Sequence, residues 1–204
     1  MTVTEGTKAK NPNPQGKGLV PVLDDLQTLV VQPGAPKSPA QFLRDYFISS
    51  LVLSARFRFR PVVGRSYFLY SGKPEWLLSL IAPAQWHGTP PGEFVGRCTL
   101  RGDMTWDLET RNLEGLDDVS QDVLAFIESF VDRVTAEGSV GSSLPFYLST
   151  LPYHQRALAT ALASSLQQSM TQTETGEDVA GQVDLLLADA AAMQRLLGPD
   201  HAAS

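Results

Sequence analysis

Apolar positions recur at two different spacings along the chain, and the change of spacing divides it into segments. Between residues 38 and 55 they fall three or four apart, as on one face of a helix. Ser38 and Gln41 can form a capping box, and Pro39 suits the first helical position. The pattern predicts a helix that begins at Ser38 and ends near Ala55.

The next part of the chain has the two-residue period of strands. Residues 56–60 alternate strictly between arginine and phenylalanine, which predicts a strand that Pro61 either ends or places at a sheet edge. Further strands are predicted, with turn residues between them, over residues 67–70, 76–81, 94–100 and 104–108. The first two of these form a hairpin. We interpret residues 56–109 as an antiparallel meander of about four strands.

The rest of the chain returns to helical spacing. One apolar stripe predicts a helix over residues 117–137, and a second predicts a helix that opens at Pro145 or Pro152. A heptad seam of fewer than three repeats runs from Val179 to Leu197. The expected fold class is α+β, with one helix, then an antiparallel meander of about four strands, then about three helices.

These patterns suggest three parts. Residues 1–18 are polar and rich in lysine, asparagine, proline and glycine, which is typical of a flexible N-terminal arm. Residues 19–111 hold the first helix and the sheet module. Residues 112–204 form an acidic helical region. We expect it to pack on or beside the sheet, because a bare four-stranded sheet leaves an apolar face to be covered.

Composition and charge restrict the class of protein. Hydrophobic residues make up 43% of the 204 residues, too many for a wholly disordered chain. The single cysteine excludes a disulfide framework and suits a reducing compartment. A formal net charge of -6 argues against nucleic acid or an anionic membrane as a partner of the whole molecule. The charge is unevenly divided, because residues 37–111 carry +4 and residues 112–204 carry -10.

The sequence holds no recognisable targeting or membrane signal. Its first twenty residues lack the apolar run of a signal peptide. The longest apolar stretches fall far short of the about 20 residues that cross a bilayer. We therefore expect a cytoplasmic protein with no membrane among its partners.

Motifs for catalysis are missing. The chain has no phosphate loop, dinucleotide fingerprint, nucleophile elbow or zinc-protease motif. Its three histidines and one cysteine are too few and too scattered for a zinc site. We expect no catalytic residue, no metal and no cofactor, and interpret Cys98 as a small buried strand residue. The alternative is an unfamiliar enzyme site at which His87, Asp103 and Cys98 converge.

The sheet module carries the candidate binding residues. Arg56, Arg58 and Arg60 would project from one strand face about 7 Å apart, where they could hold a phosphate or carboxylate. The charge of -10 on residues 112–204 favours the other interpretation, in which the acidic helices cover these arginines. Aromatic residues of a sheet more often belong to the core, but Trp86 stands in a proline- and glycine-rich loop of the kind that makes contacts. The candidate ligand- or partner-binding residues are Arg56, Arg58, Arg60, Tyr67, Tyr70, Trp86, His87, Asp103 and Trp106.

The order of aromatic and polar residues in this module resembles a known family. The residues that carry the resemblance are Gly64-x-x-Tyr67-x-Leu69-Tyr70, Leu78-Ser79-Leu80-Ile81-x-Pro83-x-x-Trp86, Phe94-Val95-Gly96, Leu100 and Asp103-x-Thr105-Trp106. Over residues 56–109 the chain is similar to the uncharacterised family described as domain of unknown function 2452, of the bacterial type. That family usually has Pro-x-Glu-Trp-Gly where this chain has glutamine at position 85, which removes a carboxylate. The resemblance implies a shared sheet module and no established activity.

The leading functional hypothesis is a non-catalytic binding or scaffold protein that acts through the sheet module. Its partner would be another protein or a small anionic ligand. The alternatives are a small enzyme at His87, Asp103 and Cys98, and weak nucleic-acid binding through the arginine face. The seam between Val179 and Leu197 suggests either a homodimer or packing within the chain.

Overall fold

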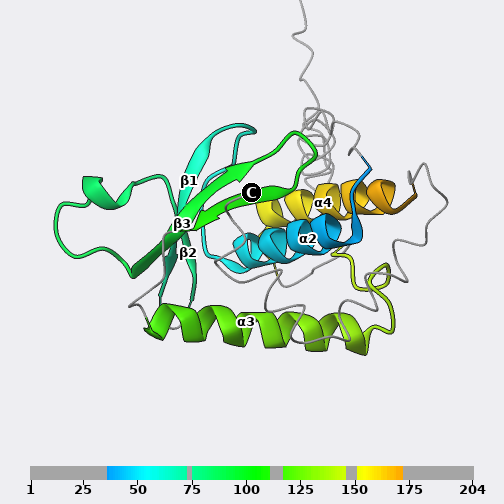
Figure 1. The fold of residues 1–204 in the computed structure, drawn as a ribbon. Coiled ribbons are helices and arrows are strands. Elements are labelled where there is room, and N and C mark those ends of the chain that lie inside the picture. Colours follow the sequence, from blue (N-terminus) through cyan, green and yellow to red (C-terminus); the bar gives the residue numbers. More distant parts are fainter. Residues whose placement is uncertain (1–35, 73–74, 111–116, 146–150, 172–204) are drawn as a thin grey trace, which may run out of the picture. The chain divides into compact units, whose positions relative to one another are not determined.

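The structure is a computed structural model, and it describes residues 36–72, 75–110, 117–145 and 151–171. All of these belong to one compact unit, Val31–Ser204. In chain order its elements, shown in Figure 1, are helix α2 (Pro39–Ser54), strands β1 (Ser66–Ser71) and β2 (Leu77–Ser79), the short 3-10 helix η1 (Pro83–Gln85), strands β3 (Glu93–Leu100) and β4 (Trp106–Thr110), and helices α3 (Asp117–Ala136) and α4 (Tyr153–Thr171). The expected α+β fold class is confirmed.

Helix α2 begins where its capping residues predict. The Ser38 hydroxyl accepts a hydrogen bond from the Gln41 amide at 3.3 Å, and the Gln41 side chain accepts one from the Ser38 amide at 3.3 Å. Pro39 takes the first helical position, where its missing N–H has no intrahelical partner to lose. The helix ends at Ser54, because Ala55 has extended backbone angles of φ -72° and ψ 148°. The predicted helix is confirmed at both ends.

The four strands form one antiparallel sheet, as expected, in the order β2-β1-β3-β4. A simple meander would place β2 beside β3, whereas here β1 lies between them. The connection over residues 80–92 explains the difference, because it is long enough to carry the chain past β1 to its other side. β1 pairs with β3 from Ser66 to Ser71, and with β2 only from Phe68 to Tyr70.

Residues 56–60 do not form the predicted strand, although their alternation is real. Only Arg56 pairs, in an isolated parallel bridge to Leu77. Phe57 is 3% exposed, and the ring of Phe59 stacks on a buried tyrosine of β1 with centroids 5.2 Å apart. The strand prediction was wrong because the core, rather than a ladder of backbone hydrogen bonds, holds the two phenylalanines. The arginines between them stay exposed.

The turn between β3 and β4 delays the start of β4 to Trp106, two residues after the predicted start. The Met104 amide donates to the Arg101 carbonyl at 3.0 Å, and the Arg101 amide donates to the Thr105 carbonyl at 2.8 Å. Met104 has φ 63°, the left-handed conformation that glycine usually takes in such a hairpin loop. Its side chain is only 2% exposed, so its burial offsets a backbone cost of about 1–2 kcal/mol.

Two described helices follow the sheet. The predicted helix over residues 117–137 is confirmed as α3, which ends one residue earlier. α4 opens after Pro152, the second of its two predicted starts. The Pro152 carbonyl accepts hydrogen bonds from the amides of Gln155 and Arg156 at 2.9 and 3.1 Å.

Helix α2 contacts β4, α3 and α4. Most of its residues are buried, as expected for a helix that is apolar on nearly all sides. Tyr46 and Phe47 meet the ring of Phe130 on α3 edge-on, with centroids 5.0 and 5.4 Å apart. The core of the described fold is therefore built around α2.

Some expectations fall outside the described residues. They are the N-terminal arm over residues 1–18, the boundary between residues 111 and 112, and the seam from Val179 to Leu197 with the homodimer that it suggested. In the part of the chain that is described, no helix combines the length and the apolar character needed to cross a membrane.

Candidate functional site

The segment that follows α2 holds three exposed arginines and, after them, two exposed valines. Arg56, Arg58 and Arg60 are all exposed, so neither of the described acidic-half helices covers them. Val62 and Val63 come next in the chain and are 56% and 48% exposed. We call these five residues the arginine–valine surface.

The arginine–valine surface adjoins β2, which is an edge strand of the sheet. The Arg56 amide donates to the Trp76 carbonyl at 2.7 Å, and the Arg56 carbonyl accepts from the Leu78 amide at 3.1 Å. Just beyond β2, Leu80 and Ile81 are 45% and 39% exposed. Exposed apolar side chains therefore lie both at the end of the arginine–valine surface, at Val62 and Val63, and just after β2, at Leu80 and Ile81.

Tyr67 fastens the valine part of the surface to the sheet. Its hydroxyl accepts a hydrogen bond from the Val62 amide at 2.7 Å. Because Phe68 lies opposite Ser79, the start of β1 lies beside the residues that follow β2. The rings of Tyr67 and Trp106 meet edge-on with centroids 5.7 Å apart, and each residue is 1% exposed. Both of these candidate residues are core residues.

Trp86 is half-buried and fastened to the sheet. Its indole N–H donates to the Tyr70 hydroxyl at 2.9 Å, and the two rings meet edge-on with centroids 6.0 Å apart. The Tyr70 hydroxyl donates in turn to the Ile81 carbonyl at 2.9 Å. Burial raises the pKa of Tyr70, although the hydrogen bond from Trp86 acts in the opposite direction. His87, the next residue, is exposed.

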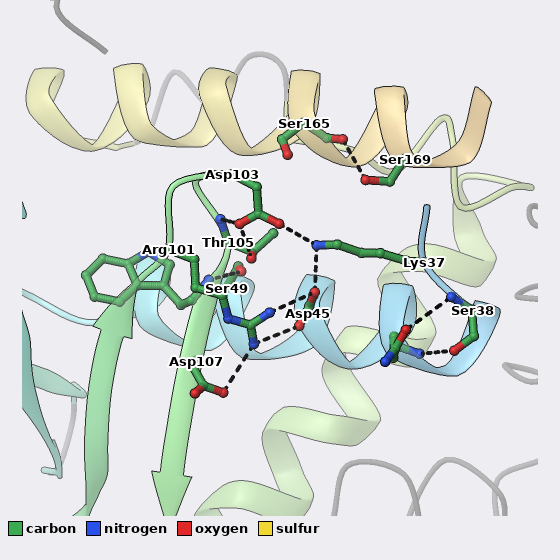
Figure 2. A network of polar contacts seen from close by, with 12 residues as sticks. Lys37, Ser38, Asp45, Ser49, Arg101, Asp103, Thr105, Asp107, Ser165 and Ser169 are labelled. Carbon is green, nitrogen blue, oxygen red and sulfur yellow. Dashed lines mark hydrogen bonds and ion pairs between the residues drawn. The ribbon is translucent and has the colours of Figure 1, made fainter. Parts of the chain in front are cut away.

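Asp103 belongs to a polar network that the sequence pattern did not predict. Figure 2 shows the Lys37 ammonium between two carboxylates, with Nζ 2.7 Å from Oδ2 of Asp45 and 2.7 Å from Oδ2 of Asp103. The other Asp103 oxygen accepts from the Thr105 amide at 3.1 Å and from the Thr105 hydroxyl at 2.6 Å. The side chains of Lys37, Asp45 and Asp103 are 9%, 7% and 15% exposed. Both carboxylate oxygens of Asp103 therefore make contacts within the protein.

Arg101 extends this network to β4. Its two terminal nitrogens lie 3.3 and 3.2 Å from the two oxygens of Asp45, and Nη2 lies 3.1 Å from Oδ1 of Asp107. Nearby, the Trp106 amide donates to the buried Ser49 hydroxyl at 3.0 Å. We call Lys37, Asp45, Arg101, Asp103 and Asp107 the polar network. It joins the residue before the α2 cap, helix α2, the β3–β4 turn and strand β4.

The charges of the polar network stabilise one another. Burial alone would raise the pKa of Asp103, but hydrogen bonds from Lys37 and Thr105, together with the Lys37 charge, outweigh it and lower that pKa. Burial alone would lower the pKa of Arg101, but the neighbouring carboxylates of Asp45, Asp107 and Asp103 raise it. These groups contact one another across α2, the β3–β4 turn and β4, so we assign the network a role in supporting the fold.

The lowered pKa of Asp103 predicts acid sensitivity. Its contribution to stability is complete above the unfolded-state pKa of about 3.9 and is lost as the pH falls through the lower folded-state pKa. We expect the free energy of unfolding, measured by urea denaturation, to fall less steeply below pH 4 in Asp103→Asn than in the wild type. Equal slopes in the two proteins would contradict this assignment.

Sequence reasoning missed Lys37, Asp45 and Arg101 as members of a site. One signal was available, because Asp45 lies in the middle of a helix whose other inward residues are apolar or small. A carboxylate at such a position needs a cationic or hydrogen-bonding partner. The identity of the partner was not accessible, because the network joins side chains up to 66 residues apart in the sequence.

The residues of the alternative enzyme hypothesis are not brought together. Cys98 is fully buried in β3, and burial raises the pKa of its thiol far above the ordinary range. Asp103 follows the end of β3. His87 comes after Trp86, which is hydrogen-bonded to Tyr70, and Tyr70 lies opposite Phe94 at the start of β3. About 20 Å of strand separates these two places.

The Cys98 thiol should therefore be inert in the folded protein. A thiol reagent such as 5,5′-dithiobis(2-nitrobenzoate) at pH 8 reacts with thiolates, and a fully buried thiol with a raised pKa supplies almost none. We expect labelling to be slower by a factor of at least about 100 in the native protein than in urea. Native labelling at the rate of a free thiol would contradict the buried placement of Cys98.

The described residues include no group of three or more histidine, cysteine, aspartate or glutamate side chains placed to hold a metal ion. Comparison with known proteins adds no relative: no family model matches the chain, and neither a curated protein nor a solved structure matches it. The resemblance to domain of unknown function 2452 therefore rests on the residues of the sheet module alone.

Proposed function

We propose that this chain is a non-catalytic binding protein of the cytoplasm that contacts an acidic protein partner through the arginine–valine surface. One observation carries the proposal. Residues 56–65 contain four arginines and no carboxylate, and their arginine and valine side chains are exposed. Lys37 and Arg101 of the same module belong to the polar network and lie outside this surface.

The chemistry of this surface favours a protein over other anionic partners. Arginines beside exposed aliphatic side chains combine charge-assisted hydrogen bonds with apolar burial, as at protein interfaces. Phe57 is buried and Phe59 is stacked within the fold, so neither ring is available to stack on a nucleic-acid base. The exposed ion pair of Arg56 with Glu75, at 3.6 Å, is too weak to prevent a partner from competing for the guanidinium.

Two further points support a binding role. The thiol of Cys98 is buried, and Asp103 is engaged by Lys37 and Thr105, so two residues of the alternative enzyme site are occupied by structural contacts. The resemblance of the sheet module to an uncharacterised family of the bacterial type is compatible with this role and suggests no reaction.

Selection from a displayed random peptide library on the full chain tests the proposal. We expect enriched peptides to share several carboxylates flanking aliphatic residues. Arg58→Glu should fail to enrich them, because it places a like charge in the centre of the surface. Arg97→Glu is the matched control, since Arg97 is an exposed arginine of β3 outside the surface. Failure to enrich acidic peptides, or equal enrichment by Arg58→Glu, would refute the proposal.

A further inference from the structure

A cavity of about 220 Å³ lies beside α2, away from the residues assigned to partner binding. α2, α3 and residues of the connection from α3 to α4 form its wall. The lining residues are Tyr46, Ser50, Leu53, Ser54, Arg133, Ser143, Pro145 and Leu151. Nothing in the proposed partner binding uses this space.

The sequence of α2 explains why the space is open. Tyr46, Ser50, Leu53 and Ser54 lie four, three and one residues apart, so they share one face of the helix. Large apolar side chains occupy most other inward positions of α2. Two serines on this face leave room that larger side chains would fill.

Most hydroxyls that line the cavity donate their protons internally. The Tyr46 hydroxyl donates to the Ser143 carbonyl at 2.5 Å, and burial raises the pKa of this tyrosine, which keeps the phenol protonated. Ser143 donates to the Val140 carbonyl at 2.8 Å, and Ser54 to the Leu51 carbonyl at 2.7 Å. These groups can still accept hydrogen bonds, but they do not offer donors to an anion.

Arg133 and Ser50 supply the donors. Arg133 is the one cation among the described lining residues, and its guanidinium carbon lies 5.5 Å from the ring centroid of Phe130, one turn earlier on α3. This cation–π contact limits the orientations of the side chain before any ligand arrives. Glu137, on the next turn, is exposed and does not line the cavity. The half-buried hydroxyl of Ser50 faces the same space from α2.

We propose that this cavity binds a small organic carboxylate. The Arg133 guanidinium, aided by the Ser50 hydroxyl, holds the carboxylate, because a guanidinium presents paired donors that match its two oxygens. Leu53, Pro145 and Leu151 enclose the apolar body of the ligand. The cavity is smaller than the roughly 300–1,000 Å³ of sites for drug-sized ligands, so the ligand is a small one.

Titration calorimetry and protein-observed NMR on the full chain test this proposal with benzoate, hexanoate and the neutral benzamide. We expect saturable one-to-one binding of at least one of the two carboxylates, and weaker binding of benzamide than of benzoate. Arg133→Gln should weaken carboxylate binding on the order of tenfold, the usual size of a charge-assisted hydrogen bond. Ser50→Leu should abolish binding by filling the cavity without touching the charge.

Two controls make each outcome decisive. Arg97→Gln removes an equal charge from the exposed face of β3 and should bind the carboxylates as the wild type does. Thermal unfolding of each variant verifies that it is folded. Absence of saturable carboxylate binding by the wild type up to tens of millimolar would overturn the proposal. So would unchanged carboxylate affinity in Arg133→Gln, or in folded Ser50→Leu. None of these three results bears on peptide binding by the arginine–valine surface, which is tested separately.

Discussion

Replacing Asp45 with alanine is expected to lower the free energy of unfolding by about 3–5 kcal/mol, the usual cost of breaking a buried ion network by removing one member. Asp45 is the only member that contacts both cations of the network, with Lys37 at 2.7 Å and Arg101 at 3.2 Å. Its loss removes one of two carboxylate partners from the buried Lys37 ammonium and from the partly exposed Arg101 guanidinium. Urea denaturation at pH 7 measures the change.

The matched control for this variant is Glu109→Ala. Glu109 pairs with Arg97 at 3.6 Å, but the two side chains are 66% and 54% exposed. An exposed pair of this kind contributes less than about 1 kcal/mol. A loss below about 1 kcal/mol in Asp45→Ala as well would show that the polar network does not support the fold. A double-mutant cycle of Asp45→Ala with Lys37→Ala measures the interaction energy between these two side chains directly.

Replacing Trp106 with alanine is expected to cost about 3–5 kcal/mol of stability. The indole, at the start of the edge strand β4, is 1% exposed and meets the ring of Tyr67 on β1 edge-on. Its removal leaves a cavity that the surrounding strands and helix cannot close. Thermal and urea unfolding would both report the loss.

Trp76→Ala provides the comparison for Trp106→Ala. Trp76 is half-buried just before β2, so the same substitution there removes less apolar surface from the core. We expect a clearly smaller loss of stability. If Trp106→Ala were as stable as Trp76→Ala while losing peptide binding, Trp106 would be a contact residue, as its inclusion among the candidate residues supposed.

Local signals in the sequence predicted the elements of this fold well. Ser38 and Gln41 predicted the start of α2 because a capping box needs only residues three apart. The strand order was not predictable in the same way. Whether β3 pairs with β1 or with β2 depends on contacts between distant segments, and periodicity carries no information about which strands become neighbours.

The pattern at residues 56–60 shows how a correct observation led to a wrong element. Alternation predicts which side chains are buried, and Phe57 is buried between exposed arginines as expected. It does not predict whether the backbone finds a strand to pair with. Beyond the bridge at Arg56, the rings of Phe57 and Phe59 pack within the fold, and the chain leaves the sheet.

The candidate site was predicted only in part, for a similar reason. The sequence singled out the arginines of the sheet module and favoured their being covered, whereas they are exposed. It also grouped them with Tyr67, Trp106 and Asp103, which the fold uses internally. Residue type alone cannot separate a contact residue from a core residue. The positive charge of residues 37–111 divides likewise into cations neutralised within the polar network and arginines left at the surface.

The most direct test of the proposed function is the affinity of an acidic peptide, obtained by selection, for four forms of the full chain. These are the wild type, the triple variant Arg56→Ala/Arg58→Ala/Arg60→Ala, the double variant Val62→Ser/Val63→Ser, and Arg97→Ala. We predict at least about tenfold weaker binding by the triple and double variants, an unchanged affinity for Arg97→Ala, and weaker binding of a single-stranded oligonucleotide than of the peptide. Equal affinity across the four forms, or tighter binding of the oligonucleotide, would contradict the account.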